Sequence, residues 1–118
     1  MVMEIQRQNG TLSIAGVTEL TFANAREFRK AVMAKLDSEL KQIVVDLSQT
    51  EFVDGGGLGA LLMIYRIANE KNPAHAVRLR LMYPQGPVQQ MLDLTQMRHL
   101  FEIVTATESQ PEQKKVAV

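Results

Sequence analysis

One stretch near the middle of the chain constrains the fold more than any other. Residues 42–47 are apolar, rich in β-branched side chains and show little alternation, which is typical of a strand buried on both faces of a mainly parallel sheet. A short connection ends at Asp54, and residues 55–67 read as a helix. A strand, a connection and a helix in this order predict an α/β protein.

The first residues carry the pattern of a β-hairpin. Apolar and polar residues alternate over residues 3–6 and again over residues 12–14, with Asn9 and Gly10 between them. Both turn residues tolerate the positive φ of a tight hairpin turn. We expect Gly16 to end the second strand and a loop to follow over residues 17–21.

Helical and strand patterns then alternate to the end of the chain. Apolar residues three to four apart predict one buried helix face from Phe22, Ala25, Phe28, Val32 and Leu36. Residues 77–82 alternate as a strand, Pro87 suits the first turn of a further helix, and residues 97–104 suggest a helical turn and a short strand. The pattern indicates one α/β domain over residues 1–107 and a polar C-terminal tail over residues 108–118.

Composition excludes several classes of function. The 118 residues include 13 Lys and Arg, 13 Asp and Glu, and no cysteine, so the formal net charge is zero and disulfides are excluded. This balance gives no electrostatic case for binding nucleic acid. No apolar run reaches the roughly 18–20 residues that a membrane span needs, and the N-terminus lacks the layout of a secretory signal. We expect a cytoplasmic protein without direct membrane insertion, which could still serve a membrane complex as a subunit.

Three consecutive glycines follow Asp54, which is well placed to cap the helix. Glycine lowers helix stability, so the choice needs a reason. One reason is close approach of another segment to the helix start. Another is an anion site, since free N–H groups at a helix start favour phosphate. The spacing matches neither standard phosphate loop, which favours close approach.

At this point the sequence resembles the STAS family, which comprises the anti-sigma-factor antagonists and related domains of anion transporters. The family pattern reads roughly Asp-Leu-Ser, a short gap, then Phe-Ile-Asp-Ser-Ser-Gly-Leu-Gly. The matching residues are Asp46, Leu47, Ser48, Phe52, Val53, Asp54 and residues 57–62. The resemblance covers about residues 3–107. It implies a mixed sheet of four to five strands with helices packed mostly on one face.

The resemblance also implies a mechanism. These antagonists bind an anti-sigma factor that is itself a serine kinase of the histidine-kinase-like ATPase type, and binding frees a sigma factor. The kinase phosphorylates the first serine after the aspartate, and the added charge of about −1.5 to −2 disrupts docking. This chain departs from the pattern there, because Gly55 occupies the phosphoserine position and Gly56 replaces the second serine. An engineered serine replacement would give the same sequence.

The predicted partner-binding residues are those at the helix start: Asp54, Gly55, Gly56, Gly57 and Leu58. Three hypotheses follow. The first is a phosphorylation-blind antagonist, and the second is a STAS subunit of a signalling scaffold or of a lipid or anion transport complex. The third is a nucleotide- or anion-binding domain. Each hypothesis is compatible with a homodimer.

Other residues weigh less. For Leu58, core packing and partner contact are equally supported, whereas Leu61 and Leu62 are expected in the core. Ser48 and Thr50 are alternative phosphosites, although Ser48 is expected to hydrogen-bond locally and Thr50 to be a loop residue with an exposed hydroxyl.

An enzyme is not expected, and neither is a cofactor or a metal. The two histidines, His75 and His99, read as a solvated loop residue and a half-buried packing residue, and they lack metal-ligand spacing. The G-x-S-x-G motif is absent. Asp46 and Asp54 could form a carboxylate pair, but strand-end hydrogen bonding and helix capping are the favoured roles.

Overall fold

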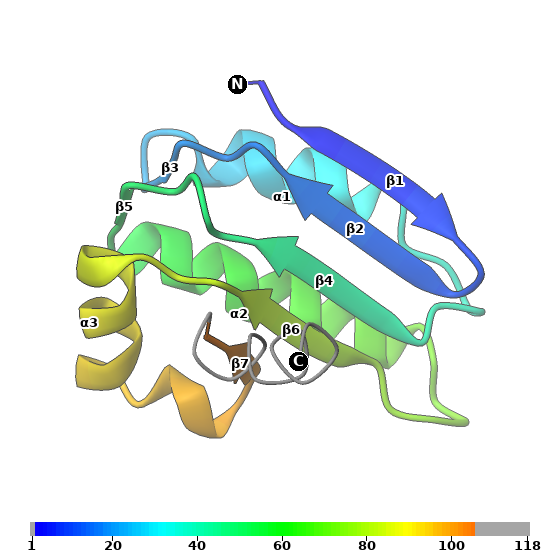
Figure 1. Ribbon diagram of the computed structural model, residues 1–118. Coiled ribbons are helices and arrows are strands. Elements are labelled where there is room, and N and C mark those ends of the chain that lie inside the picture. The colour runs from blue at the N-terminus through cyan, green and yellow to red at the C-terminus, as the bar shows by residue number, and fades with distance from the viewer. Residues whose placement is uncertain (1, 106–118) are drawn as a thin grey trace, which may run out of the picture.

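The computed structural model describes residues 2–105. Its main sheet has five strands in the order β1-β2-β4-β6-β7, and β1 is antiparallel to β2 while the other neighbours are parallel. These strands are β1 (Glu4–Gln8), β2 (Thr11–Ala15), β4 (Gln42–Asp46), β6 (Arg78–Met82) and β7 (Glu102–Val104). The helices lie mostly along one face of this sheet (Figure 1), as the resemblance to the STAS family implies.

The hairpin forms as predicted. Asn9 and Gly10 have φ of 50° and 86°, and they join β1 to β2 directly after the pair Gln8↔Thr11. Two consecutive positive φ angles are what the favoured two-residue hairpin turn requires.

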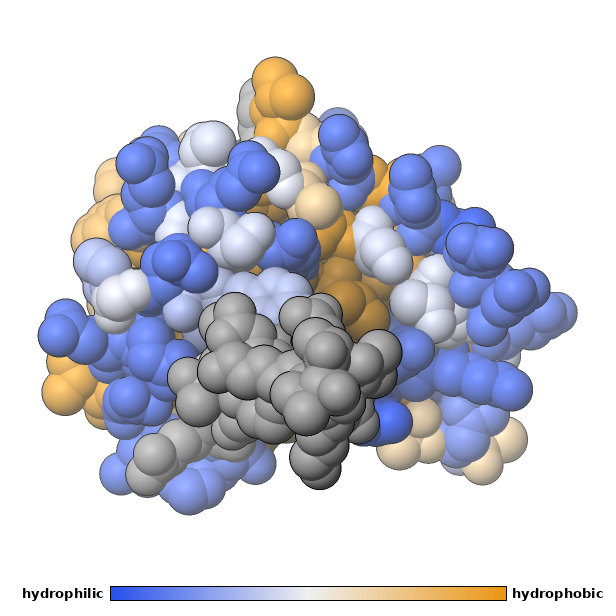
Figure 2. All heavy atoms as spheres, viewed as in Figure 1, coloured by the Kyte–Doolittle hydropathy of each residue, from blue (hydrophilic) through white to orange (hydrophobic). Residues whose placement is uncertain are grey.

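The prediction that residues 42–47 are buried on both faces is wrong. Ile43 and Val45 are fully buried, whereas Val44, which points to the other side, is only half-buried. The chain passes from β2 to β4, from β4 to β6 and from β6 to β7 in the same direction across the sheet. Connections between parallel strands share one handedness, so the helices in these connections lie on the same side of the sheet. The opposite face is turned to the viewer in Figure 2 and is predominantly hydrophilic around the grey atoms.

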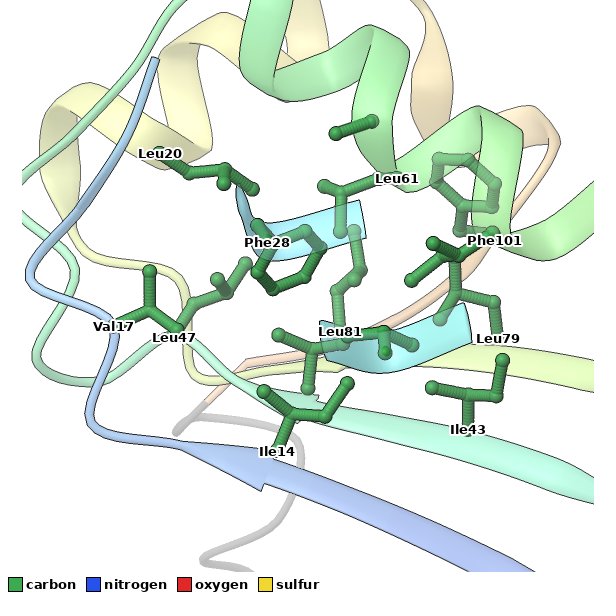
Figure 3. Packing of buried hydrophobic residues seen from close by; sticks show 14 of the residues in the cluster. Ile14, Val17, Leu20, Phe28, Ile43, Leu47, Leu61, Leu79, Leu81 and Phe101 are labelled. Atoms are coloured by element: carbon green, nitrogen blue, oxygen red, sulfur yellow. The ribbon is translucent and has the colours of Figure 1, made fainter. Parts of the chain in front are cut away.

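The core fills the space between the sheet and the helices α1 (Ala25–Met33) and α2 (Gly55–Glu70). Phe28 is fully buried and lies among Leu20, Leu61 and the sheet residues Ile14 and Leu81 (Figure 3). The aromatic ring therefore joins the two helices to the sheet.

The apolar face predicted for the first helix is correct for Ala25, Phe28 and Val32, but not for Phe22. The helix begins only at Ala25, and Phe22 is 80% exposed. Thr21 and Asn24 stabilise the turn before the helix: the N–H of Ala23 donates to Thr21 Oγ1 (3.2 Å), and the N–H of Thr21 donates to the Asn24 side-chain oxygen (2.9 Å).

The remaining elements follow the sequence pattern. Helix α3 (Gly86–Leu94) has Pro87 in its first turn, and it buries Val88 and Leu92. A 3₁₀ turn, η1 (Met97–His99), precedes β7. The tail predicted for residues 108–118 lies outside the described residues, and so does the predicted domain end at residue 107.

Candidate functional site

Asp54 caps α2, as predicted, and it also holds a second segment. Its Oδ1 accepts a hydrogen bond from the Gly57 N–H (2.9 Å), and its Oδ2 accepts one from the Phe22 N–H (3.2 Å). The bond from Gly57, followed by weaker ones from Phe22 and Gly56, holds the pKa of this carboxyl below its ordinary value. The carboxylate thus fixes the segment before α1 against the start of α2.

A small second sheet at this point has no counterpart in the sequence prediction. β3 (Glu19–Leu20) lies within the predicted loop 17–21, and it pairs in parallel with β5 (Phe52–Val53). Strands of two residues are too short to show an alternation. The pairing carries β3 across the first turn of α2, which makes a tight contact there.

The close approach expected of the glycines holds for two of them. A Cβ on Gly57 would stand 2.0 Å from the Leu20 carbonyl oxygen, and one on Gly56 would stand 2.5 Å from the Phe22 Cβ. Any larger residue at either position would have to displace the backbone of the crossing segment. Gly56 and Gly57 therefore serve packing within the chain.

Gly55 and Gly59 are different. Each is exposed, and a Cβ on either one would meet no other atom within 4 Å. Close approach within the chain therefore gives no reason for glycine at these positions. Gly55 presents a bare backbone, without a hydroxyl, at the first residue of α2.

The geometry weakens the case for an anion at the helix start. The Asp54 carboxylate already accepts the Gly57 N–H, and its negative charge lies where a phosphate would have to approach. An anion would compete with this internal carboxylate for the same donor.

The leucines of α2 divide between core and surface. Leu58 is 3% exposed and Leu61 is fully buried, so the Leu58 side chain belongs to the core and offers little surface to a partner. The core position expected for Leu62 is wrong, because its side chain is 37% exposed. Beside it, Tyr65 makes an edge-to-face contact with Phe101, with ring centroids 5.5 Å apart.

The two alternative phosphosites also differ. Ser48 is exposed, and its backbone N–H donates to Asp46 Oδ1 (2.9 Å). This is the strand-end role expected of Asp46, and the bond does not involve the Ser48 hydroxyl. The exposed hydroxyl expected for Thr50 is wrong: Thr50 is fully buried, and its Oγ1 donates to the Val17 carbonyl oxygen (2.5 Å). A kinase could not reach the Thr50 hydroxyl in the folded chain.

The histidines show no site. His75 is exposed, as expected, and His99 is exposed rather than half-buried. Within residues 2–105, no three His, Cys, Asp or Glu residues lie close enough together to hold a metal ion. Over the same residues, no helix combines the length and apolar character needed to cross a membrane.

Sequence reasoning missed the surface next to Gly55. Phe22, Arg26 and Arg29 line a groove between α1 and α2, opposite Gly56, Gly59 and Met63. The helical spacing of Phe22 suggested core, and only its position before the cap residue Asn24 could have shown otherwise.

This combination defines a class: a single α/β domain with helices on one sheet face and an aspartate-capped, glycine-rich helix start at the surface. A family model for the STAS domain matches residues 2–110, and the chain therefore belongs to the STAS domain family. No curated protein matches the sequence.

Solved structures share this fold. A candidate anti-sigma factor antagonist from Thermotoga maritima is 22% identical with a TM-score of 0.74, over 93% of this chain and 92% of that one. Unphosphorylated SpoIIAA, an anti-sigma factor antagonist, is 16% identical with a TM-score of 0.61, over 99% of this chain and 100% of that one. The murine anion transporter Slc26a9 is 24% identical with a TM-score of 0.63, over 75% of this chain but 14% of the transporter.

Proposed function

We propose that this chain is a non-catalytic regulatory protein of the anti-sigma-factor-antagonist type, which acts in the cytoplasm by docking on a protein partner. The partner is an anti-sigma factor with a histidine-kinase-like ATPase domain that acts as a serine kinase. Docking takes place at the start of α2, around Asp54, Gly55, Gly56 and Gly57, with Leu58 supporting the helix from the core.

One observation carries the proposal. Gly55 is exposed at the position that the family pattern gives to the phosphorylated serine, and the space above it is open. The capped backbone around it is kept, while the hydroxyl that would accept a phosphate is absent. The chain would therefore stay in the binding-competent form whether or not ATP is present.

The test combines the purified chain with the histidine-kinase-like anti-sigma factors of its source organism, with and without ATP. Complex formation is followed by calorimetry, and the mass of the chain by mass spectrometry. We expect a complex under both conditions and an unchanged mass. Failure to bind any kinase of this type would refute the proposed partner, and a mass gain of one phosphate would refute the phosphorylation-blind behaviour.

The Gly55→Ser variant is the matched control, because a Cβ at this position meets no neighbouring atom. It should bind the kinase without ATP as the parent chain does. With ATP it should gain one phosphate and dissociate. A variant that binds but is never phosphorylated would show that position 55 is not where the kinase acts.

The likeness to a segment of an anion transporter supports a second candidate, a STAS subunit of a transport complex or of a signalling scaffold. Purification of the tagged chain from membranes distinguishes the two, since recovery of transporter subunits without a kinase would favour this candidate. We do not propose a nucleotide- or anion-binding role, because the Asp54 carboxylate occupies the helix start.

A further inference from the structure

The groove between α1 and α2 has features that the fold itself does not require. It measures about 380 Å³, and we call it the α1–α2 groove. Phe22, Arg26 and Arg29 line it on the α1 side, and Gly56, Gly59 and Met63 line it on the α2 side. It starts beside Gly55 and so borders the docking site proposed above.

Gly59 is the first of these features. It lies in the second turn of α2, where glycine lowers helix stability relative to alanine. Its backbone is exposed, and a Cβ would meet nothing within 4 Å. Because no contact within the described chain needs a glycine there, the bare backbone points to close approach by another molecule.

Phe22 is the second feature. Its side chain is 80% exposed, yet its backbone is held by the hydrogen bond to Asp54 and by the contact with Gly56. An aromatic side chain on a fixed backbone loses little conformational entropy on binding, and aromatic residues are enriched among the residues that dominate binding energy.

Arg26 and Arg29 are the third feature. They lie three residues apart on α1 and line the same side of the groove. Within residues 2–105, neither guanidinium makes an ion pair or a side-chain hydrogen bond, whereas Arg7, Arg66, Arg78 and Arg80 all do. Two cations without counter-charges beside an exposed aromatic ring complement an acidic and apolar ligand.

We propose that the α1–α2 groove receives an acidic amphipathic helix of the protein partner. Gly59 leaves the backbone of α2 exposed in this groove, so a third helix can pack closely against it between α1 and α2. Its apolar side chains contact Phe22 and Met63, and its carboxylates pair with Arg26 and Arg29. The inference rests on the proposed docking function and specifies the partner segment.

Photo-crosslinking in the source organism tests it. The crosslinking residue p-benzoylphenylalanine replaces Phe22 in the groove or, in a second variant, Phe52, which is 51% exposed and does not line the groove. The crosslinked peptides are sequenced. We expect Phe22 to yield a segment rich in Asp and Glu, with apolar residues at i, i+3, i+4 and i+7.

The outcomes separate the two proposals. A basic segment, an extended segment or a second copy of this chain at position 22 overturns the acidic helix. Crosslinks from position 52 alone would leave the proposed docking function in place and overturn the proposal that the partner helix binds in the α1–α2 groove. No crosslink from either position, in variants that fold normally, overturns both.

Charge reversal gives an independent readout with the identified partner. Arg26→Glu combined with Arg29→Glu should weaken binding by about tenfold or more, and the loss should shrink as salt rises. The matched control reverses Lys30 and Lys35, which are exposed nearby and do not line the groove. Equal losses of binding affinity in both double variants would mean that only the net charge of the chain matters. That result would overturn the proposed ion pairs with Arg26 and Arg29.

Discussion

The carbonyl oxygen of Leu20 lies 2.0 Å from the place where a Cβ would stand on Gly57. The same oxygen accepts the Asp54 N–H (3.3 Å), so it cannot move away without losing a bond at the cap of α2. β3 and the helix start are therefore in backbone-to-backbone contact. This contact explains a glycine that neither helix propensity nor phosphate binding explains.

Gly57→Ala should destabilise the fold. The new methyl group must displace the Leu20 backbone, and overpacking of this kind costs roughly 1–3 kcal/mol, more than the gain in helix propensity of about 1 kcal/mol. Urea unfolding followed by circular dichroism measures the loss.

Gly59→Ala is the matched control in the same helix. Its methyl group meets nothing within 4 Å, so we expect a gain of up to about 1 kcal/mol from propensity alone. Equal effects of the two alanines would contradict the close approach at Gly57.

Replacement by serine should leave the stability of the fold unchanged at Gly55 but lower it at Gly56. At position 55 the added side chain has open space, and the melting temperature should stay close to that of the parent chain. At position 56 the added Cβ would lie 2.6 Å from the Phe22 Cα, so the segment before α1 must shift, at a cost of roughly 1–3 kcal/mol. Differential scanning calorimetry of both variants decides, and an undisturbed Gly56→Ser variant would show that Phe22 yields easily.

Local signals predicted the parts of the fold that depend on neighbouring residues. The Asn9-Gly10 turn, the Asp54 cap and the start of α2 each follow from residues within one turn of one another. The family pattern indicates Gly55 as the centre of the proposed docking site, which stays a prediction, and the structure leaves the surface of Gly55 open.

Contacts between distant segments were not predicted. Phe22 reaches Asp54 across 32 residues, and Thr50 reaches Val17 across 33. Periodicity cannot report such contacts, so Phe22 was assigned to the core and the Thr50 hydroxyl to the surface. The groove beside Gly55 depends on the first of these contacts, which is why sequence reasoning missed it.

Thr50→Val should destabilise the fold although it preserves shape. The Val17 carbonyl oxygen would lose the donor that now lies 2.5 Å away, and a buried group left unpaired costs about 1–3 kcal/mol. Thr50→Ser keeps the hydroxyl and serves as the control for the lost hydrogen bond. Urea unfolding should show the larger loss for valine, and a neutral Thr50→Val would mean that the hydroxyl contributes nothing to stability.

Because of Asp54, the folded chain should become less stable as the pH is lowered. Its hydrogen bonds, first that from Gly57, place the folded pKa below the unfolded value of about 3.9. The contribution of the charged carboxylate is therefore complete above the unfolded pKa and disappears as pH falls through the folded pKa. Asp54→Asn should be less stable than the parent near neutral pH, and the difference should narrow in acid.

Asp37 should also lower the stability of the fold in acid. An Arg7 guanidinium nitrogen donates to both oxygens of the Asp37 carboxylate, at 3.1 Å each, and these bonds lower the pKa of Asp37. The comparison is therefore made in an Asp37→Asn background, and the difference in stability between the chains with and without Asp54→Asn isolates the contribution of the Asp54 carboxylate. Urea unfolding at a series of pH values between about 2 and 7 gives the two stability curves. Parallel curves would mean that the Asp54 carboxylate is no better stabilised in the folded chain than in the unfolded one, and that the cap acts through geometry alone.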